Sequence, residues 1–240
     1  LHHAGEIVGK LLGNRDSSVE DEVILMSDAL SHNRSKLKSV NVTVNSALCN
    51  AHARRNFYEL KDDFQKQVDW LLLMYTEVFK NDRKTKDMSP AERLVFHQQH
   101  SLPIMNEMKE KLIADLDVNK VVEPNSRLGK AYKYFINHFE DLCAFARFEN
   151  APVTNNLCER ILKAAIRHRR NSLFFKNTLG ALVADIFMSI LITAHHNKVN
   201  PIQYLTDLLN HSENVDAAPR DWLPWNYKAT VEALKVNASS

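Results

Sequence analysis

Two stretches near the start of the chain have the apolar pattern of β-strands. Val23–Ser27 is a short, continuous apolar run, which favours a buried strand covered on both faces of a sheet. Val40–Leu48 alternates apolar and polar residues, which is also typical of a strand. Around them we expect a short helix that ends near Gly13 and another over Ala29–Leu37. The first part of the chain is therefore predicted to mix strands with helices.

From Tyr58 to Glu149 the apolar residues recur at steps of three and four, with no strand pattern. This period predicts a succession of amphipathic helices around a core. Ser89, Pro90 and Glu92 resemble a capping box with a proline just inside the start of a helix, and Pro103 marks a further break. We interpret this region as a helical block inserted into the chain.

The segment Ala151–Phe175 is predicted to form a helix capped by Asn155 or Asn156. A set of apolar residues at helical spacing gives it a face to bury: Leu157, Ile161, Leu162, Ala165 and Ile166. A different face carries Glu159, followed at steps of three and four by Lys163, Arg167 and Arg170. A line of cations suits a backbone of phosphates, and a carboxylate at its head suits a divalent metal. The alternative is a solvated face whose acid simply favours the helix dipole.

The last part of the chain is also predicted to be helical. Leu179–Asn197 is the most apolar segment, and Asp185 interrupts its longest apolar run, so we expect a buried helix and no membrane span. A further helix over Ile202–Leu209 follows an Asn-Pro pair. Trp222 and Trp225 bracket a proline, and we expect both to pack onto the body; a hook for a partner protein is the alternative.

Composition narrows the function classes. Of 240 residues, 45% are hydrophobic and 25% are charged, as in soluble globular proteins. Only 5 are glycine, and the sequence contains neither GxxxxGK(S/T) nor GxGxxG, which argues against a glycine-rich phosphate loop. The net charge is only +2, so nucleic-acid binding must depend on local clusters. Three cysteines do not make a disulfide framework and fit the reducing cytoplasm.

Two places in the first part of the chain carry candidate chemistry. Asp28 lies at the carboxyl end of the first predicted strand, and α/β sheets commonly bind ligands and metals at this edge. The alternative role of Asp28 is to cap the next helix. Cys49 and His52 have the spacing of half a zinc site, but no second pair matches it, which disfavours zinc. Arg54 and Arg55 are candidates for phosphate contacts, or else form an ordinary exposed helix start.

The motifs VILMSDALSHN, CNAHARRNF, VTNNLCERILKAAIRHRRNSLFF and LPWNYK follow one another in this order. Together they resemble the insertion-sequence sixty-six (IS66-type) family of Asp-Asp-Glu (DDE) transposases, over nearly the whole chain. The resemblance implies an α/β fold: an RNase H-like catalytic core, N-terminally incomplete and with few strands, interrupted by a large all-helical insertion. The parts expected are residues 1–60 (core with the second Asp), 61–148 (insertion), 149–200 (core helices with the Glu) and 201–240 (C-terminal helix and tail).

The resemblance also implies roles for individual residues. Asp28 matches the family's second catalytic aspartate and Glu159 its catalytic glutamate, and both would be ligands of two Mg²⁺ (or Mn²⁺) ions. The cations of both blocks are expected to contact DNA: His52, Arg54, Arg55, Arg160, Lys163, Arg167, Arg169 and Arg170. The alternative role is local structural support, for His52, Arg54 and Arg55. The chain departs from the family pattern at Thr154, where Asp is usual, and at Asn50, where Trp is common.

The activity implied is cutting of insertion-sequence ends and strand transfer into target DNA. The partners implied are element ends and target DNA, further copies of the same chain, and accessory proteins of the same element, in the bacterial cytoplasm at the nucleoid. The family's first catalytic Asp is expected upstream of Leu1. We therefore expect a fragment that is inactive by itself. The alternatives are a non-catalytic DNA-binding remnant and a helical interaction module.

Overall fold

The computed structural model describes residues 9–10, 12–13, 22–28, 43–171 and 175–238. The predicted helix over Ala29–Leu37, and most of the one ending near Gly13, lie outside these residues. The chain divides into two compact units, residues 1–157 and 158–240, which are described separately below. The four-part division expected from the sequence stays a prediction.

The strands β1 (Glu22–Ser27) and β2 (Thr43–Leu48) form a parallel pair, in register from Glu22 opposite Thr43 to Ser27 opposite Leu48. Both predicted strands are thus confirmed. The prediction that the first is buried is wrong, because every residue of β1 is at least partly exposed. In the described residues β1 packs onto a small cluster around Ala47 through Ile24 and Met26, which are two residues apart on one face of the strand and only partly covered. A small parallel sheet is established; a complete RNase H-like core is not.

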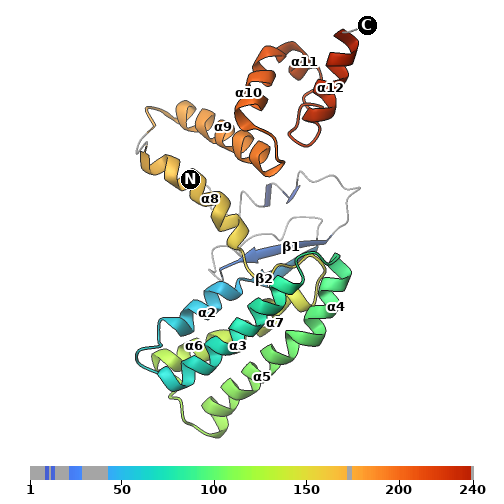
Figure 1. The fold of residues 1–240 in the computed structure, drawn as a ribbon. Helices are drawn as coiled ribbons and strands as arrows, with labels where there is room; N and C mark the ends of the chain where they lie inside the picture. The colour runs from blue at the N-terminus through green and yellow to red at the C-terminus, as the bar shows by residue number, and fades with distance from the viewer. Residues whose placement is uncertain (1–8, 11, 14–21, 29–42, 172–174, 239–240) are drawn as a thin grey trace. The chain divides into compact units, whose positions relative to one another are not determined.

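The predicted helical block is confirmed, and the described residues after β2 contain no strand. Its main helices pack side by side (Figure 1): α2 (Asn50–Tyr58), α3 (Gln65–Lys84), α4 (Pro90–His100), α5 (Leu102–Ile113) and α6 (Arg127–Asn137). Shorter turns are η2 (Ala114–Val118), α7 (Phe139–Leu142) and η3 (Ala144–Ala146). The last part of the block, from Arg127 to Ala146, is divided among α6, α7 and η3. The protein as described is predominantly helical.

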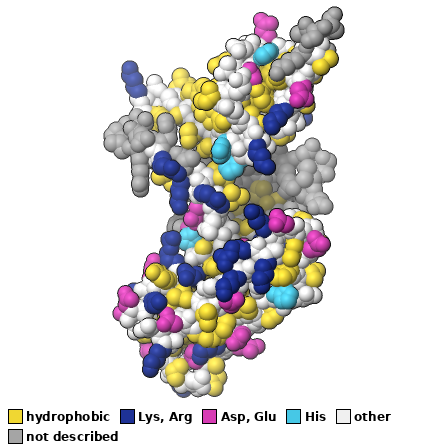
Figure 2. All heavy atoms as spheres, in the orientation of Figure 1, with side chains coloured by type: hydrophobic (Ala, Val, Ile, Leu, Met, Phe, Trp, Pro, Cys, Tyr) yellow, Lys and Arg dark blue, Asp and Glu magenta, His cyan; other side chains and the backbone are white. Residues whose placement is uncertain are grey.

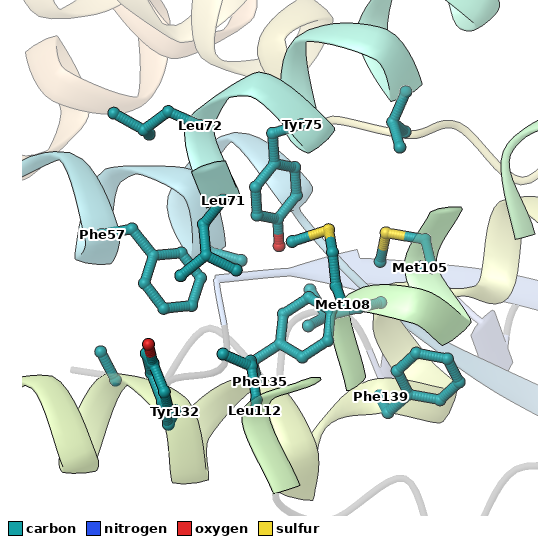
Figure 3. Close-up of a cluster of buried hydrophobic side chains, with 14 of the residues drawn as sticks. Phe57, Leu71, Leu72, Tyr75, Met105, Met108, Leu112, Tyr132, Phe135 and Phe139 are labelled. Carbon is teal, nitrogen blue, oxygen red and sulfur yellow. The ribbon is translucent and has the colours of Figure 1, made fainter. Parts of the chain in front are cut away.

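Aromatic rings from distant helices fill the core of the block (Figure 3). The ring of Phe57 in α2 lies 6.3 Å, centroid to centroid, from each of three rings: Tyr75, Tyr132 and Phe135. All four side chains are buried, and such aromatic contacts add to the hydrophobic contribution of their area. Because α2 follows β2 directly, Phe57 fixes the sheet to the helical block.

Asn50, the first residue of α2, joins three segments of the first unit. Its side chain is fully buried, and Nδ2 donates to the carbonyl oxygens of Leu142 at 2.9 Å and Val153 at 3.2 Å. Its backbone N–H also donates to Val153, at 3.1 Å. The end of β2, the end of α7 and the segment that leads into the next helix therefore meet at this one amide.

The connection from α3 to α4 is held by a polar network. Ser89 and Glu92 form the predicted capping box, with Pro90 in the first turn of α4. Arg93 Nη2 lies 2.9 Å from Asp82 Oδ1, and Nε2 of the fully buried His97 lies 3.6 Å from the same oxygen. Burial opposes ionisation of Asp82, but the neighbouring His97 and Arg93 lower its pKa below the usual 3.8.

The second unit contains most of α8 (Asn156–Asn171) together with four further helices: α9 (Thr178–His196), α10 (Pro201–Asn210), α11 (Ser212–Ala217) and α12 (Tyr227–Ala238). A small core includes Tyr204 and Trp222, and the Tyr204 hydroxyl donates to the Trp222 carbonyl at 2.6 Å. The packing expected of the tail is confirmed for Trp222 and wrong for Trp225, whose side chain is 61% exposed. Trp225 is absent from the cluster of apolar residues around Trp222.

The prediction that the most apolar segment is a buried helix is wrong. Ala194 is the one buried residue of α9, while Leu179 is 68% exposed. The described residues of the chain leave most of this helix uncovered. α9 is also the one described helix that is long and apolar enough to cross a membrane, with a mean hydropathy of 1.7 over its best window. Length and composition by themselves are weak grounds for a span, since apolar helices of soluble proteins pass the same test.

We expect Asn50→Ala to lower the free energy of unfolding by about 2 kcal/mol, because the buried carbonyl of Leu142 loses its hydrogen-bond donor. Urea unfolding followed by circular dichroism measures the change. Asn106→Ala, on an exposed face of α5, is the matched control and should be near neutral. Equal unfolding midpoints for the two variants would contradict the role assigned to Asn50.

We expect Asp82→Asn to destabilise the first unit by about 1–2 kcal/mol at pH 7, since charged hydrogen-bonded partners are lost. The folded-state pKa of Asp82 is below its unfolded value of 3.8, so its contribution is complete above about pH 4 and is lost as pH falls through the folded pKa. Urea midpoints of wild type and variant should converge as pH falls through the folded-state pKa of Asp82. Asp87→Asn, at an exposed acid of the same turn, is the matched control and should leave the urea midpoint at pH 7 near that of wild type.

Candidate catalytic carboxylates and nucleic-acid interface

Asp28 directly follows β1, at the carboxyl end of the parallel pair, and its side chain is partly buried. The parallel hydrogen-bond pattern continues past the strands, because the backbone N–H of Cys49 donates to the Ser27 carbonyl at 3.1 Å. The start of α2 therefore lies at the same edge of the sheet as Asp28. The carboxyl edge of parallel strands is where α/β proteins place ligands.

The cations predicted on α2 differ in exposure. Arg55 is exposed, whereas Arg54 is partly buried with its guanidinium 5.8 Å from the centre of the Tyr58 ring. His52 is also partly buried. The exposed guanidinium of Arg55 suits a phosphate contact, while the contact of Arg54 with Tyr58 suits the structural role that the sequence left open.

Glu159 lies in the first turn of α8 and is partly buried. Arg160, Lys163 and Arg167 are exposed on the same helix, so these cations are accessible to a ligand. The side chains of Arg169 and Arg170 lie outside the described residues.

The prediction that the apolar face of α8 is buried is wrong at Leu157, Leu162 and Ile166, which are between 49% and 58% exposed. Ile161 of the same face is partly buried. The predicted cap is confirmed in position only. Asn155 precedes the first helical residue, but its buried side-chain oxygen accepts no hydrogen bond from the described residues.

The chemical kind of the two carboxylates fits a hard divalent cation, which prefers oxygen ligands. Within the described residues, no group of three or more His, Cys, Asp or Glu side chains could hold a metal ion. Asp28 belongs to the first unit and Glu159 to the second. Within the first unit, the carbonyl of Val153 accepts hydrogen bonds from Asn50 at the sheet edge where Asp28 lies. Val153 comes shortly before Glu159 in the sequence.

Sequence reasoning noted Asn50 only as a departure from a family pattern, and the structure shows it to be the residue that connects these segments. The available signal was its position, immediately after the second strand and at the first residue of a helix. Its partners were not readable from the sequence, because they lie 92 and 103 residues away along the chain.

A family model described as "Transposase IS66 family" matches residues 3–182. The chain belongs to the IS66 family of transposases. This membership confirms the resemblance carried by the motifs around Asp28, Cys49 and Glu159. Membership of this family points to a transposase-related function.

Three similar proteins of Sinorhizobium fredii are all described as uncharacterized. Two of them, y4jD and y4hP, are 29% and 27% identical to this IS66-family chain, in each case over 82% of its length. The third, y4qI, is 28% identical over 78% of the chain. The chain spans 39%, 38% and 35% of these three relatives. No solved structure matches it.

We expect a maleimide reagent to label Cys158 of the native chain at least about tenfold faster than Cys49 or Cys143, since the latter two need local opening. Burial raises the pKa of the Cys143 thiol to about 12, which further slows its reaction. Mass spectrometry after proteolysis gives the rates, and labelling in urea is the control. Equally slow labelling of all three thiols would show that the face of α8 beside Glu159 is covered in solution.

Proposed function

We propose that this chain is part of a DNA transposase that cuts insertion-sequence ends and joins them to target DNA, with Asp28 and Glu159 as its catalytic carboxylates. Membership of the IS66 family supports the class of activity. The observation that carries the assignment of residues is the pair of hydrogen bonds from Asn50 to Val153. These bonds hold the segment leading to α8 at the carboxyl edge of the parallel pair, where Asp28 directly follows β1.

The proposed role of the two carboxylates is to hold Mg²⁺ or Mn²⁺, two ions in the complete site. Carboxylate oxygens are the hard ligands that these ions prefer. When bound, such ions neutralise developing charge at a scissile phosphodiester. Glu159 lies in the first turn of α8, and the amino end of a helix is a favourable position for a negative charge.

The proposed role of the basic side chains is to bind the DNA backbone. Lys163 and Arg167 are exposed on α8, at steps of four from Glu159 and from each other. Arg55 adds an exposed cation on α2, the helix that begins at the sheet edge where Asp28 lies. Contacts of this type position DNA without reading its sequence, and they make binding sensitive to salt. Assembly with further copies, accessory proteins of the same element and a nucleoid location belong to the same proposal.

The test uses the natural protein that contains this chain, with Mg²⁺ and a DNA fragment bearing an element end. We expect Asp28→Asn and Glu159→Gln each to reduce strand cleavage by at least about two orders of magnitude, the scale of losing one group that stabilises transition-state charge. Asp62→Asn and Glu149→Gln, at exposed acids of the first unit, are the matched controls and should cleave like wild type.

Two results would overturn parts of this proposal. Strong Mg²⁺-dependent cleavage that survives in both the Asp28 and Glu159 variants would remove the catalytic assignment. DNA binding by a natural protein that cleaves nothing, with affinity unchanged or tighter in both variants, would favour the non-catalytic DNA-binding module.

A further inference from the structure

A pocket of about 650 Å³ lies in the first unit where α3 ends and α4 begins. Its lining includes Asp82, Arg83, Thr85, Lys86, Arg93 and Asn150. None of these residues belongs to the sequence motifs or to the proposed catalytic set. Figure 2 shows Lys and Arg side chains gathered on the visible face of the first unit.

The pocket carries a net positive charge. Arg83 and Lys86 are exposed, and within the described part of the chain neither has an acidic partner. Asp82 is the one acid among the lining residues, and its charge is offset by Arg93 at 2.9 Å. The neighbouring Glu92 is occupied in the capping box, where its carboxylate accepts from Ser89 N at 2.9 Å and Oγ at 2.7 Å.

The walls of the pocket are fixed before any ligand arrives. Thr85 is buried, and its hydroxyl donates to the Asp82 carbonyl at 2.8 Å, which holds the turn after α3. On α4, Arg93 Nη2 lies 2.9 Å from Asp82 Oδ1, which joins the start of α4 to the end of α3. Preformed walls reduce the ordering that binding would otherwise require.

A cation in the last turn of a helix is stabilised by the helix dipole, and this would be enough to explain Arg83 by itself. Lys86 lies beyond the last residue of α3, Arg93 comes from a different helix, and all three line one hollow. The dipole of α3 does not account for that convergence.

We propose that this pocket binds a backbone phosphate of DNA, and that the helical block therefore contributes its own contact to the transposase–DNA complex. The inference rests on the proposed function. Guanidinium and ammonium groups are the usual partners of phosphate oxygens. A free nucleotide is a poorer match, because the sequence has none of the glycine-rich loops that hold nucleotide phosphates.

The test compares double variants of the full chain by fluorescence anisotropy with two unrelated labelled duplexes over a range of salt concentrations. We expect Arg83→Ala with Lys86→Ala to weaken binding of both duplexes about tenfold and to reduce the salt slope by about one, for the one phosphate that loses its cations. Lys66→Ala with Lys133→Ala removes the same charge from exposed positions outside the pocket, and should leave the slope unchanged. Lys163→Ala with Arg167→Ala tests the proposed contacts of α8.

The outcomes separate this inference from the proposed function. If the α8 pair weakens binding while the pocket pair behaves like the control, the phosphate pocket is overturned and the transposase proposal stands. If the wild-type chain has no salt-dependent affinity for DNA, the phosphate pocket and the proposed DNA contacts of α8 are both overturned, and the catalytic assignment depends on the cleavage assay of the natural protein. Phosphorus-31 line broadening of inorganic phosphate gives the second arm. Broadening that the pocket pair abolishes, with DNA affinity unchanged, would overturn the DNA assignment in favour of free phosphate.

Discussion

The buried amide of Asn50 is the constraint on which the arrangement of the first unit depends. Its Nδ2 donates to Leu142 and to Val153, so it joins the end of the parallel strand pair to the end of the helical block and to the segment that leads into α8. Both acceptors are backbone carbonyls, which are costly to bury without a donor. The helical block lies between β2 and the segment that leads into α8, and Asn50 holds the two ends of this block together within the first unit.

Hydrophobic packing supports this polar junction. Phe57, on the same short helix as Asn50, packs against rings from α3 and α6, so the helical block is continuous with the sheet edge. The block is then more than a spacer. Its own cationic pocket faces solvent at the junction of α3 and α4, and one lining residue, Asn150, lies just before the segment that Asn50 binds.

Exposed apolar surface marks the second unit. In the described residues most of α9, and the apolar face of α8, remain uncovered. Large exposed apolar patches are unusual on monomeric soluble proteins, and they commonly mark an interface with another protein. The chain spans less than two fifths of the curated relatives it matches, and multimeric assembly is part of the proposed function.

The sequence by itself determined the elements and the family. These features depend on residues close together in the sequence, so they can be recognised without knowledge of the fold. They are the strand pattern, the helical period, the capping box at Ser89, and the motifs around Asp28 and Glu159. Tertiary structure decided the rest: that β1 is partly exposed, that Trp222 is buried and Trp225 is not, that α9 lies uncovered, and that Arg83, Lys86 and Arg93 line one pocket. Each of these depends on neighbours far away in the chain. Whether a side chain is buried, and whether side chains from different helices line one pocket, depends on how the whole chain packs. The pattern of apolar and polar residues along a segment shows only which of its faces favours burial.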